Sequence, residues 1–242
     1  MAEHHERALD RVRERFQADA KLQALMFVVD PAEMAGRRSM GALQIDASDL
    51  AQWSHGHIGG GVVDLAFLRA AAERGPEPSR FAFADARLLF ARDEEIARLL
   101  PRVPVFQESE RLEKMRSFVS QLPVHLSYLQ LGDLSHNAWL LSQTATELVF
   151  FAGRLILEHN RILYGNRKQF MAQLASAAEK PESMVEAAQE LMRAPSIARA
   201  RAFYDLVMAY RDWPVAPEGP WSRFSRDRET NWVEGQAALA DS

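Results

Sequence analysis

Apolar residues in the first hundred positions fall in short runs that end at proline, glycine or charged residues. Such runs, rich in β-branched and aromatic side chains, predict buried strands. They cover residues 22–30, 41–48, 60–66 and 87–90. Between them, apolar positions that recur every three or four residues predict helices. These cover residues 3–18, a short turn at 49–53, the stretch from about 66 to a C-capping Gly75, a turn within 79–86, and 93–103.

From residue 107 onward the apolar period becomes that of long amphipathic helices. The segments with this period cover residues 108–134, 136–165, 184–194 and 196–213. Four or five such helices joined by short connections are typical of a helical bundle. Residues 214–242 are rich in Pro, Gly and Trp and predict no long element.

Together the two patterns predict an α+β chain in which a shortened mixed β-sheet with helices precedes an α-helical bundle. The boundary is expected near Pro104, with an α/β domain over residues 1–104 and a helical domain over 105–242. We expect residues 22–30 and 60–66 to form neighbouring strands of one sheet. The tryptophans are expected in core and interface packing, because large aromatic rings dominate such contacts; they are Trp53, Trp139, Trp213, Trp221 and Trp232.

The composition narrows the function classes. The 242 residues are 48% hydrophobic and 26% charged with a net charge of −4, so the chain lacks the basic excess of a nucleic-acid binder. It has no cysteine, which excludes disulfides and thiolate chemistry. The charged N-terminal stretch predicts no signal peptide, and no apolar run predicts a membrane span. We therefore expect a cytoplasmic protein without a membrane or nucleic-acid partner.

Two blocks of sequence resemble a known family. Residues 62–100, VVDLAFLRAAAERGPEPSRFAFADARLLFARDEEIARLL, resemble the distal half of a nucleotidyltransferase domain of the DNA-polymerase-β-like superfamily. FAGRLILEHNRILYGNRKQFM and FYDLVMAYRDW resemble the helical domain that follows it in small bacterial members, such as aminoglycoside nucleotidyltransferases. The resemblance implies transfer of a nucleoside monophosphate from ATP or another nucleoside triphosphate, with Mg²⁺, to a hydroxyl of a small molecule or protein.

The motifs that carry this chemistry in the family are incomplete here. A Gly-Ser turn holds the phosphates there, and a D-x-D pair joins a third Asp to hold two Mg²⁺ ions. This chain has no Gly-Ser pair, and Leu22 and Ala24 stand where the D-x-D carboxylates would be. Asp64 matches the third position. The resemblance therefore implies Asp64 as the remaining metal ligand and catalytic carboxylate, facing a cleft.

Further site residues follow from the helical block. Asn160, Tyr164 and Lys168 recur every four residues, which predicts one helical face, and the resemblance places such a Lys near the nucleotide phosphates. The alternatives are a solvated amphipathic face or a helix end formed by these three residues. The resemblance implies Glu147 as the general base for the acceptor hydroxyl. The alternative is a structural Glu147 paired with Arg154 or Arg161.

The densest glycine cluster, GGG at 59–61, matches neither a P-loop nor a dinucleotide-binding pattern. Glycine permits tight reversals, so we interpret it as a turn that feeds the strand carrying Asp64, with Val63, Leu65 and Phe67 on its buried face. His55 and His57 precede the cluster. An exposed loop is favoured for them over a metal site shared with Asp64.

Three functions remain open at this point. The first is a nucleotidyltransferase-like protein whose transfer activity is weak or lost. The second is a non-catalytic protein, a pseudoenzyme, that binds a nucleotide or another small-molecule ligand on the same scaffold. The third is a partner-docking module, for which a homodimer is one arrangement.

Overall fold

The computed structural model describes residues 22–29, 40–46, 52–55 and 58–227, together with residues 10, 13–14, 16–18 and 20. The chain divides into two compact units, residues 1–105 and 106–242, each described by itself below. The division lies one residue from the predicted boundary. Most of the helix expected over residues 3–18 lies outside the described residues, as do residues 49–51 of the predicted turn.

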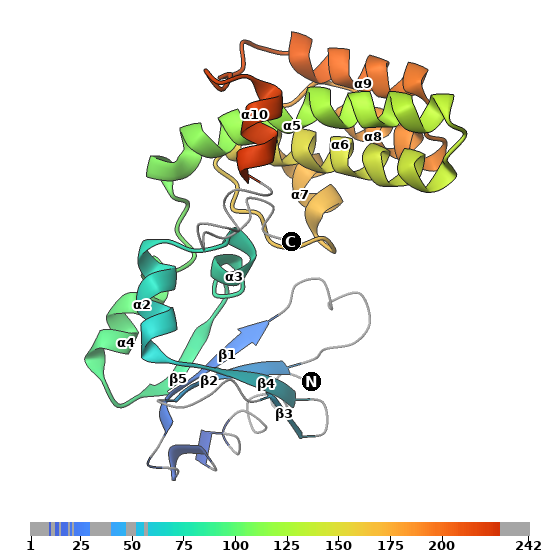
Figure 1. Ribbon diagram of the computed structural model, residues 1–242. Coiled ribbons are helices and arrows are strands. Elements are labelled where there is room, and N and C mark those ends of the chain that lie inside the picture. The colour runs from blue at the N-terminus through green and yellow to red at the C-terminus, as the bar shows by residue number, and fades with distance from the viewer. Residues whose placement is uncertain are drawn as a thin grey trace. The chain divides into compact units, whose positions relative to one another are not determined.

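Unit 1 contains a mixed sheet (Figure 1). Within the described residues the strands are β1 (Leu22–Val29), β2 (Met40–Asp46), β3 (Gln52–His55), β4 (Ile58–Val63) and β5 (Arg87–Ala91), in the spatial order β3-β4-β2-β1-β5. β2 and β4 run parallel, and the other neighbours run antiparallel. The mixed sheet confirms the α+β fold class. Gln52 and Trp53 belong to β3, so the helical turn predicted there is wrong.

The prediction that residues 22–30 and 60–66 form neighbouring strands is also wrong, because β2 lies between β1 and β4. The glycine cluster is not a turn either. Gly59, Gly60 and Gly61 pair in register with β2 on one side and with β3 on the other. β3 and β4 are antiparallel neighbours with His55 opposite Ile58, and the parallel pairing of β4 with β2 places β4 on the side of β2 away from β1.

Apolar side chains on both faces of β1 explain why it is a buried strand. Ala24 and Met26 pack with residues of α2 (Leu65–Glu73), α4 (Glu94–Leu99) and the 3₁₀ turn η2 (Leu100–Arg102), whereas Leu25 packs with Leu89 and Phe90 of β5. This alternation is that of a pleated strand. The short helix α3 (Glu77–Phe81) follows α2. Arg74 is extended at the end of α2 and Gly75 is not left-handed, so the predicted glycine C-cap is wrong.

Unit 2 is a helical bundle (Figure 1). Within the described residues its helices are α5 (Glu108–Leu134), α6 (Ala138–His159), α7 (Phe170–Ser176), α8 (Met184–Arg193), α9 (Ile197–Ala209) and α10 (Pro220–Ser225). The first, second, fourth and fifth of these match predicted segments, and the other two are short helices that the sequence pattern missed. A single buried cluster joins α5 through α9. α6 is long and apolar enough to cross a membrane, but most of it is buried, as in the core helix of a bundle.

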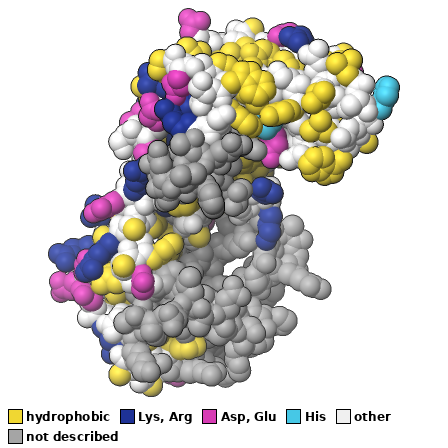
Figure 2. Space-filling model, in the orientation of Figure 1, with side chains coloured by type: hydrophobic (Ala, Val, Ile, Leu, Met, Phe, Trp, Pro, Cys, Tyr) yellow, Lys and Arg dark blue, Asp and Glu magenta, His cyan; other side chains and the backbone are white. Residues whose placement is uncertain are grey.

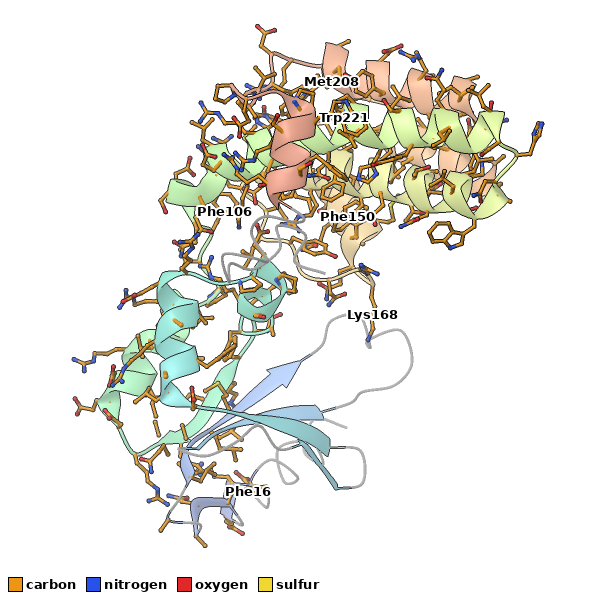
Figure 3. The ribbon with its side chains drawn as sticks, viewed as in Figure 1. Phe16, Phe106, Phe150, Lys168, Met208 and Trp221 are labelled. Carbon is orange, nitrogen blue, oxygen red and sulfur yellow. The ribbon has the colours of Figure 1, made fainter. Side chains whose placement is uncertain are left out.

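The prediction that the tryptophans pack in the core or in interfaces is confirmed for only some of them. Trp213 is buried, whereas Trp139 and Trp221 expose 69% and 50% of their surface. Trp221 lies on α10 (Figure 3) and contacts the Tyr128 ring edge-on. Trp232 lies outside the described residues, and only the backbone of Trp53 is described.

A buried ion-pair network fixes α10 on α5. Arg223 contacts the Asp227 carboxylate at 2.9 Å and Glu113 Oε2 at 2.8 Å, and Ser117 donates a hydrogen bond to Asp227. Arg223 and Asp227 are almost fully buried. The hydrogen bond from Arg223 holds the pKa of Glu113 below its usual value. The polar contacts therefore set how α10 docks.

Candidate functional site at the carboxyl ends of β2 and β4

Asp64 occupies the junction between β4 and α2. Its backbone is extended, and its side-chain Oδ1 accepts a hydrogen bond from the backbone N–H of Phe67 at 2.6 Å. This is the geometry of a helix N-cap, where a carboxylate satisfies an orphan donor and meets the positive end of the helix dipole. Leu65 and Phe67 therefore lie in a helix, and the predicted strand face that they share with Val63 is wrong. Asp64 is exposed, and its role as a ligand-facing residue stays a prediction.

The parallel pairing of β2 and β4 brings a second acidic residue to the same edge of the sheet. Ile45 pairs with Val63, and Asp46 and Asp64 are the residues that follow this pair at the carboxyl ends of the two strands. In open α/β sheets, ligands bind outside these ends. Sequence reasoning missed Asp46 because it placed β4 beside β1. An Asp at the end of each of two apolar runs was the available signal.

A cation reaches this edge from β5. Leu22 of β1 pairs with Asp46, and the Arg92 guanidinium donates to the Leu22 carbonyl at 2.8 Å and to the Gln17 carbonyl at 2.7 Å. The backbone N–H of Arg92 also donates to Gln23. Arg92 thus joins the end of β5 to the start of β1, where Leu22 pairs with Asp46.

The described donor set does not fit a two-metal site. Across the part of the chain that the structure describes, no group of three His, Cys, Asp or Glu side chains could hold a metal ion. Asp64 has one oxygen engaged as a helix cap, and so has Asp93 at the start of α4, whose Oδ1 accepts a hydrogen bond from the Glu95 N–H at 2.8 Å.

The metal site suggested by His55 and Asp64 is excluded by the strand register. His55 pairs with Ile58 at the start of β4, whereas Asp64 follows the end of that strand. At about 3.3 Å per residue the two positions are about 20 Å apart. His57 lies outside the described residues.

The helical face predicted for Asn160, Tyr164 and Lys168 does not exist, because α6 ends at His159. Asn160 is the C-cap, and its amide group donates to the carbonyls of Ile156 and Glu179 and accepts from the Glu179 N–H, at 2.7–2.8 Å. These hydrogen bonds give partners to backbone groups that the end of a helix leaves unpaired. Asn160 therefore has a structural function.

Tyr164 is buried in the core rather than in a cleft. The Arg154 guanidinium lies 4.3 Å from its ring centroid, and Phe150 and Phe170 meet the ring edge-on. Lys168, in contrast, is exposed and extends from the segment before α7 (Figure 3). Of the three residues, Lys168 is the one whose side chain is accessible to a ligand.

Glu147 lies half-buried on α6. One of its two predicted structural partners is engaged elsewhere, because Arg161 forms a bidentate pair with Glu108 at 2.8 and 3.0 Å. Asp64 belongs to unit 1, whereas Glu147 and Lys168 belong to unit 2. Their roles in one site stay a prediction.

A polar cluster at the end of α6 was not expected from the sequence. The His159 ring is 2.7 Å from Glu179 Oε2, contacts the Arg211 guanidinium, and meets the Trp213 ring edge-on. The hydrogen bond from His159 lowers the pKa of Glu179. Arg111 donates to the Glu158 and His159 carbonyls. These contacts fasten the end of α6 to the segments that follow α7 and α9.

The N-cap geometry predicts how Asp64 variants behave. Asp64→Ala should lower the free energy of unfolding by about 1 kcal/mol, because the Phe67 N–H loses its acceptor. Asp64→Asn keeps a capping oxygen and should change the free energy of unfolding by only a few tenths of the loss in Asp64→Ala. Urea unfolding of both variants measures the difference, and equal losses would show that the side chain does not act as a cap.

Comparison with known proteins agrees with this fold. Neither a protein-family model nor a curated protein matches the chain. Among solved structures, a nucleotidyltransferase-like protein from Exiguobacterium sibiricum 255-15 is similar over 85% of this chain and 74% of its own, with a TM-score of 0.53 and 12% sequence identity. At that identity the similarity concerns the fold alone. The chain has a nucleotidyltransferase-like α+β fold with a helical C-terminal part.

Proposed function

We propose that the chain is a nucleotidyltransferase-like protein that binds a nucleotide and whose nucleotidyl transfer is weak or lost. The supporting observation is the edge of the sheet where Asp46 and Asp64 end neighbouring parallel strands, within a fold similar to that of a nucleotidyltransferase-like protein. The carboxyl ends of parallel strands are where such sheets bind ligands.

The weakness of transfer follows from the chemistry that these residues lack. Leu22 and Ala24 occupy the D-x-D positions that the resemblance implies, and Asp64 Oδ1 is engaged by the Phe67 N–H. Without a full set of carboxylates, stabilisation of the triphosphate charge in the transition state falls by several kcal/mol. Asp64 and Glu147 would then be remnants of the catalytic set, and Lys168 would contact phosphate.

Non-catalytic binding of a nucleotide or small ligand is the second candidate. It is favoured by the same capping contact, because a carboxylate that serves a helix end persists for stability after catalysis is lost. Under this candidate the ligand would bind without a divalent cation.

Calorimetric titration with ATP, with and without Mg²⁺, separates these candidates. Binding that requires Mg²⁺ supports a retained transferase site, and binding that is independent of Mg²⁺ supports the ligand-binding protein. Binding of neither kind contradicts the proposal. Rapid Mg²⁺-dependent release of pyrophosphate from ATP would overturn the claim that transfer is weak.

A matched pair of variants tests the role of Lys168. Lys168→Ala should weaken ATP binding about ten- to hundredfold, because a phosphate contact of this kind contributes roughly 1.5–3 kcal/mol. Arg167→Ala removes the adjacent exposed cation and serves as the control. Equal effects of the two substitutions would show that only the local charge matters and would remove Lys168 from the site.

A further inference from the structure

The helix α10 is attached to the bundle by contacts of its own rather than by the shared core. The buried apolar cluster of unit 2 draws on α5 through α9 and on Trp213, and among the described residues it includes none from α10. α10 packs on α5 (Figure 1). On the face of unit 2 that carries it, hydrophobic side chains gather beside charged ones (Figure 2). The described core therefore does not depend on α10.

The face of α5 beneath α10 is polar. Arg223 Nε of α10 donates to Ser117 Oγ at 3.2 Å, and the Phe224 ring meets the His125 ring edge-on at 5.8 Å between centroids. Ser117, Gln121 and His125 follow one another at intervals of four residues, so they form one row along α5. We call these three residues the polar row. They expose 0%, 1% and 3% of their surface, so the row is buried while α10 is in place.

Gln121 lies in the middle of the polar row and is poorly matched to burial. Within the part of the chain that the structure describes, its Oε1 is buried and has no hydrogen-bond partner. A buried acceptor of this kind lowers stability, because it has given up its hydrogen bonds to water without replacement. Access of water to the row would restore them. The polar row therefore suits a surface that is exposed part of the time.

The build of α10 favours its separate movement. Its six residues are far fewer than the roughly 12–15 that an isolated helix needs in water. Gly219, directly before it, has φ of 87° and ψ of 163°, a conformation that is essentially restricted to glycine. The docking of α10 uses the half-exposed Trp221 and the ion pairs of Arg223. Segments with few buried apolar contacts open at a lower free energy than the whole domain.

We propose that α10 is a strap that detaches locally from α5 while the bundle stays folded, and that its detachment presents the polar row to solvent. In the attached form the ion pairs of Arg223 hold the row closed. In the detached form the Gln121 amide and the His125 ring regain contact with water, which offsets part of the loss of those ion pairs.

Thiol labelling of the full chain tests the strap, because the chain has no cysteine of its own. Gln121→Cys places one thiol in the polar row, and Val149→Cys places one in the core of α6 as the matched control, since both positions are at most 1% exposed. Dithiobis(nitrobenzoate) should react with Gln121→Cys at least about a hundredfold faster, because global unfolding alone exposes the control thiol. Ser117→Cys is nearly isosteric and should also react faster than the control.

Two second substitutions distinguish local detachment from global unfolding. Arg223→Ala breaks the ion pairs of the strap and should speed labelling of Gln121→Cys at least about tenfold. Leu191→Ala in the core of α8 should speed labelling of Val149→Cys about thirtyfold or more. It should leave labelling of Gln121→Cys unchanged, because it destabilises the attached and detached forms equally.

Three results would overturn the proposal. The first is labelling of the polar-row thiols at the rate of the Val149→Cys control. The second is acceleration of Gln121→Cys labelling by Leu191→Ala, which would show that only global unfolding exposes the row. The third is labelling of Gln121→Cys that Arg223→Ala does not change, which would show that the contacts of α10 do not cover it.

Discussion

Replacing Arg154 with Ala should lower the free energy of unfolding by about 3 kcal/mol or more. Arg154 is fully buried in the bundle, with its guanidinium 4.8 Å from the Phe118 ring centroid and 4.3 Å from that of Tyr164. A desolvated cation–π contact contributes about 2 kcal/mol. The methylene stem of Arg also fills core volume, and its removal leaves a cavity with a further cost.

Arg154→Met separates the two contributions. Met retains most of the apolar stem, so the cavity cost should largely disappear and the loss of the cation should remain. Tyr164→Phe is the control for the aromatic side, because it keeps the ring that faces the guanidinium. Urea denaturation followed by far-UV circular dichroism measures all three variants. A loss below 1 kcal/mol in Arg154→Ala would contradict a structural role for the buried cation.

The helices and strands that could be predicted are those whose apolar residues follow a clear helical or strand period. β1 carries apolar side chains on both faces, and α8 presents Met184, Ala188 and Leu191 to the core at helical spacing. Such elements bury one or two defined faces, and the period of the sequence alone specifies those faces. The α+β class and the change to helices after Pro104 follow from these patterns.

The order of the strands could not be derived in the same way. The position of β4 depends on its pairing with β3 and β2, which is a contact between distant residues rather than a local preference. Three consecutive glycines favour a turn when judged locally. In the sheet they are paired with β2 on one side and with β3 on the other. Asp46 was missed for the same reason.

The end of α6 shows how a continuing period can mislead. Residues 160–168 keep a spacing that suits a helix, but the Asn160 side chain bonds the carbonyl of Ile156, and Arg161 is left-handed with φ of 56°. Asn is a residue that competes for backbone hydrogen bonds and commonly ends helices. The three residues assigned to one nucleotide-binding face were therefore distributed over a cap, the core and the surface.

For Asp64, the sequence could not separate two uses of one carboxylate. The resemblance implies a metal ligand, and the hydrogen bond to Phe67 makes it a helix cap. An Asp directly before an apolar helical stretch is also a common capping signal. The paired Asp64 variants measure the capping use by itself.

Gly153 on α6 is the second position where a small change should have a large effect. A Cβ atom added there would lie 2.3 Å from Phe170 Cζ and 2.7 Å from Phe170 Cε2. Phe170 is itself buried against Phe150 and Tyr164, so its ring has little room to retreat. The glycine therefore allows α7 to approach α6 closely.

Gly153→Ala should destabilise the chain by about 2 kcal/mol. Overpacking of a filled core costs about 1–3 kcal/mol, and the better helix propensity of Ala returns up to about 1 kcal/mol. A double-mutant cycle with Phe170→Leu isolates the contact, because the smaller side chain vacates the space that the Ala methyl needs. In that background Gly153→Ala should be neutral or stabilising, which gives a coupling energy of about 2 kcal/mol in urea unfolding. Additive losses in the cycle would show that Phe170 does not restrict the size of residue 153.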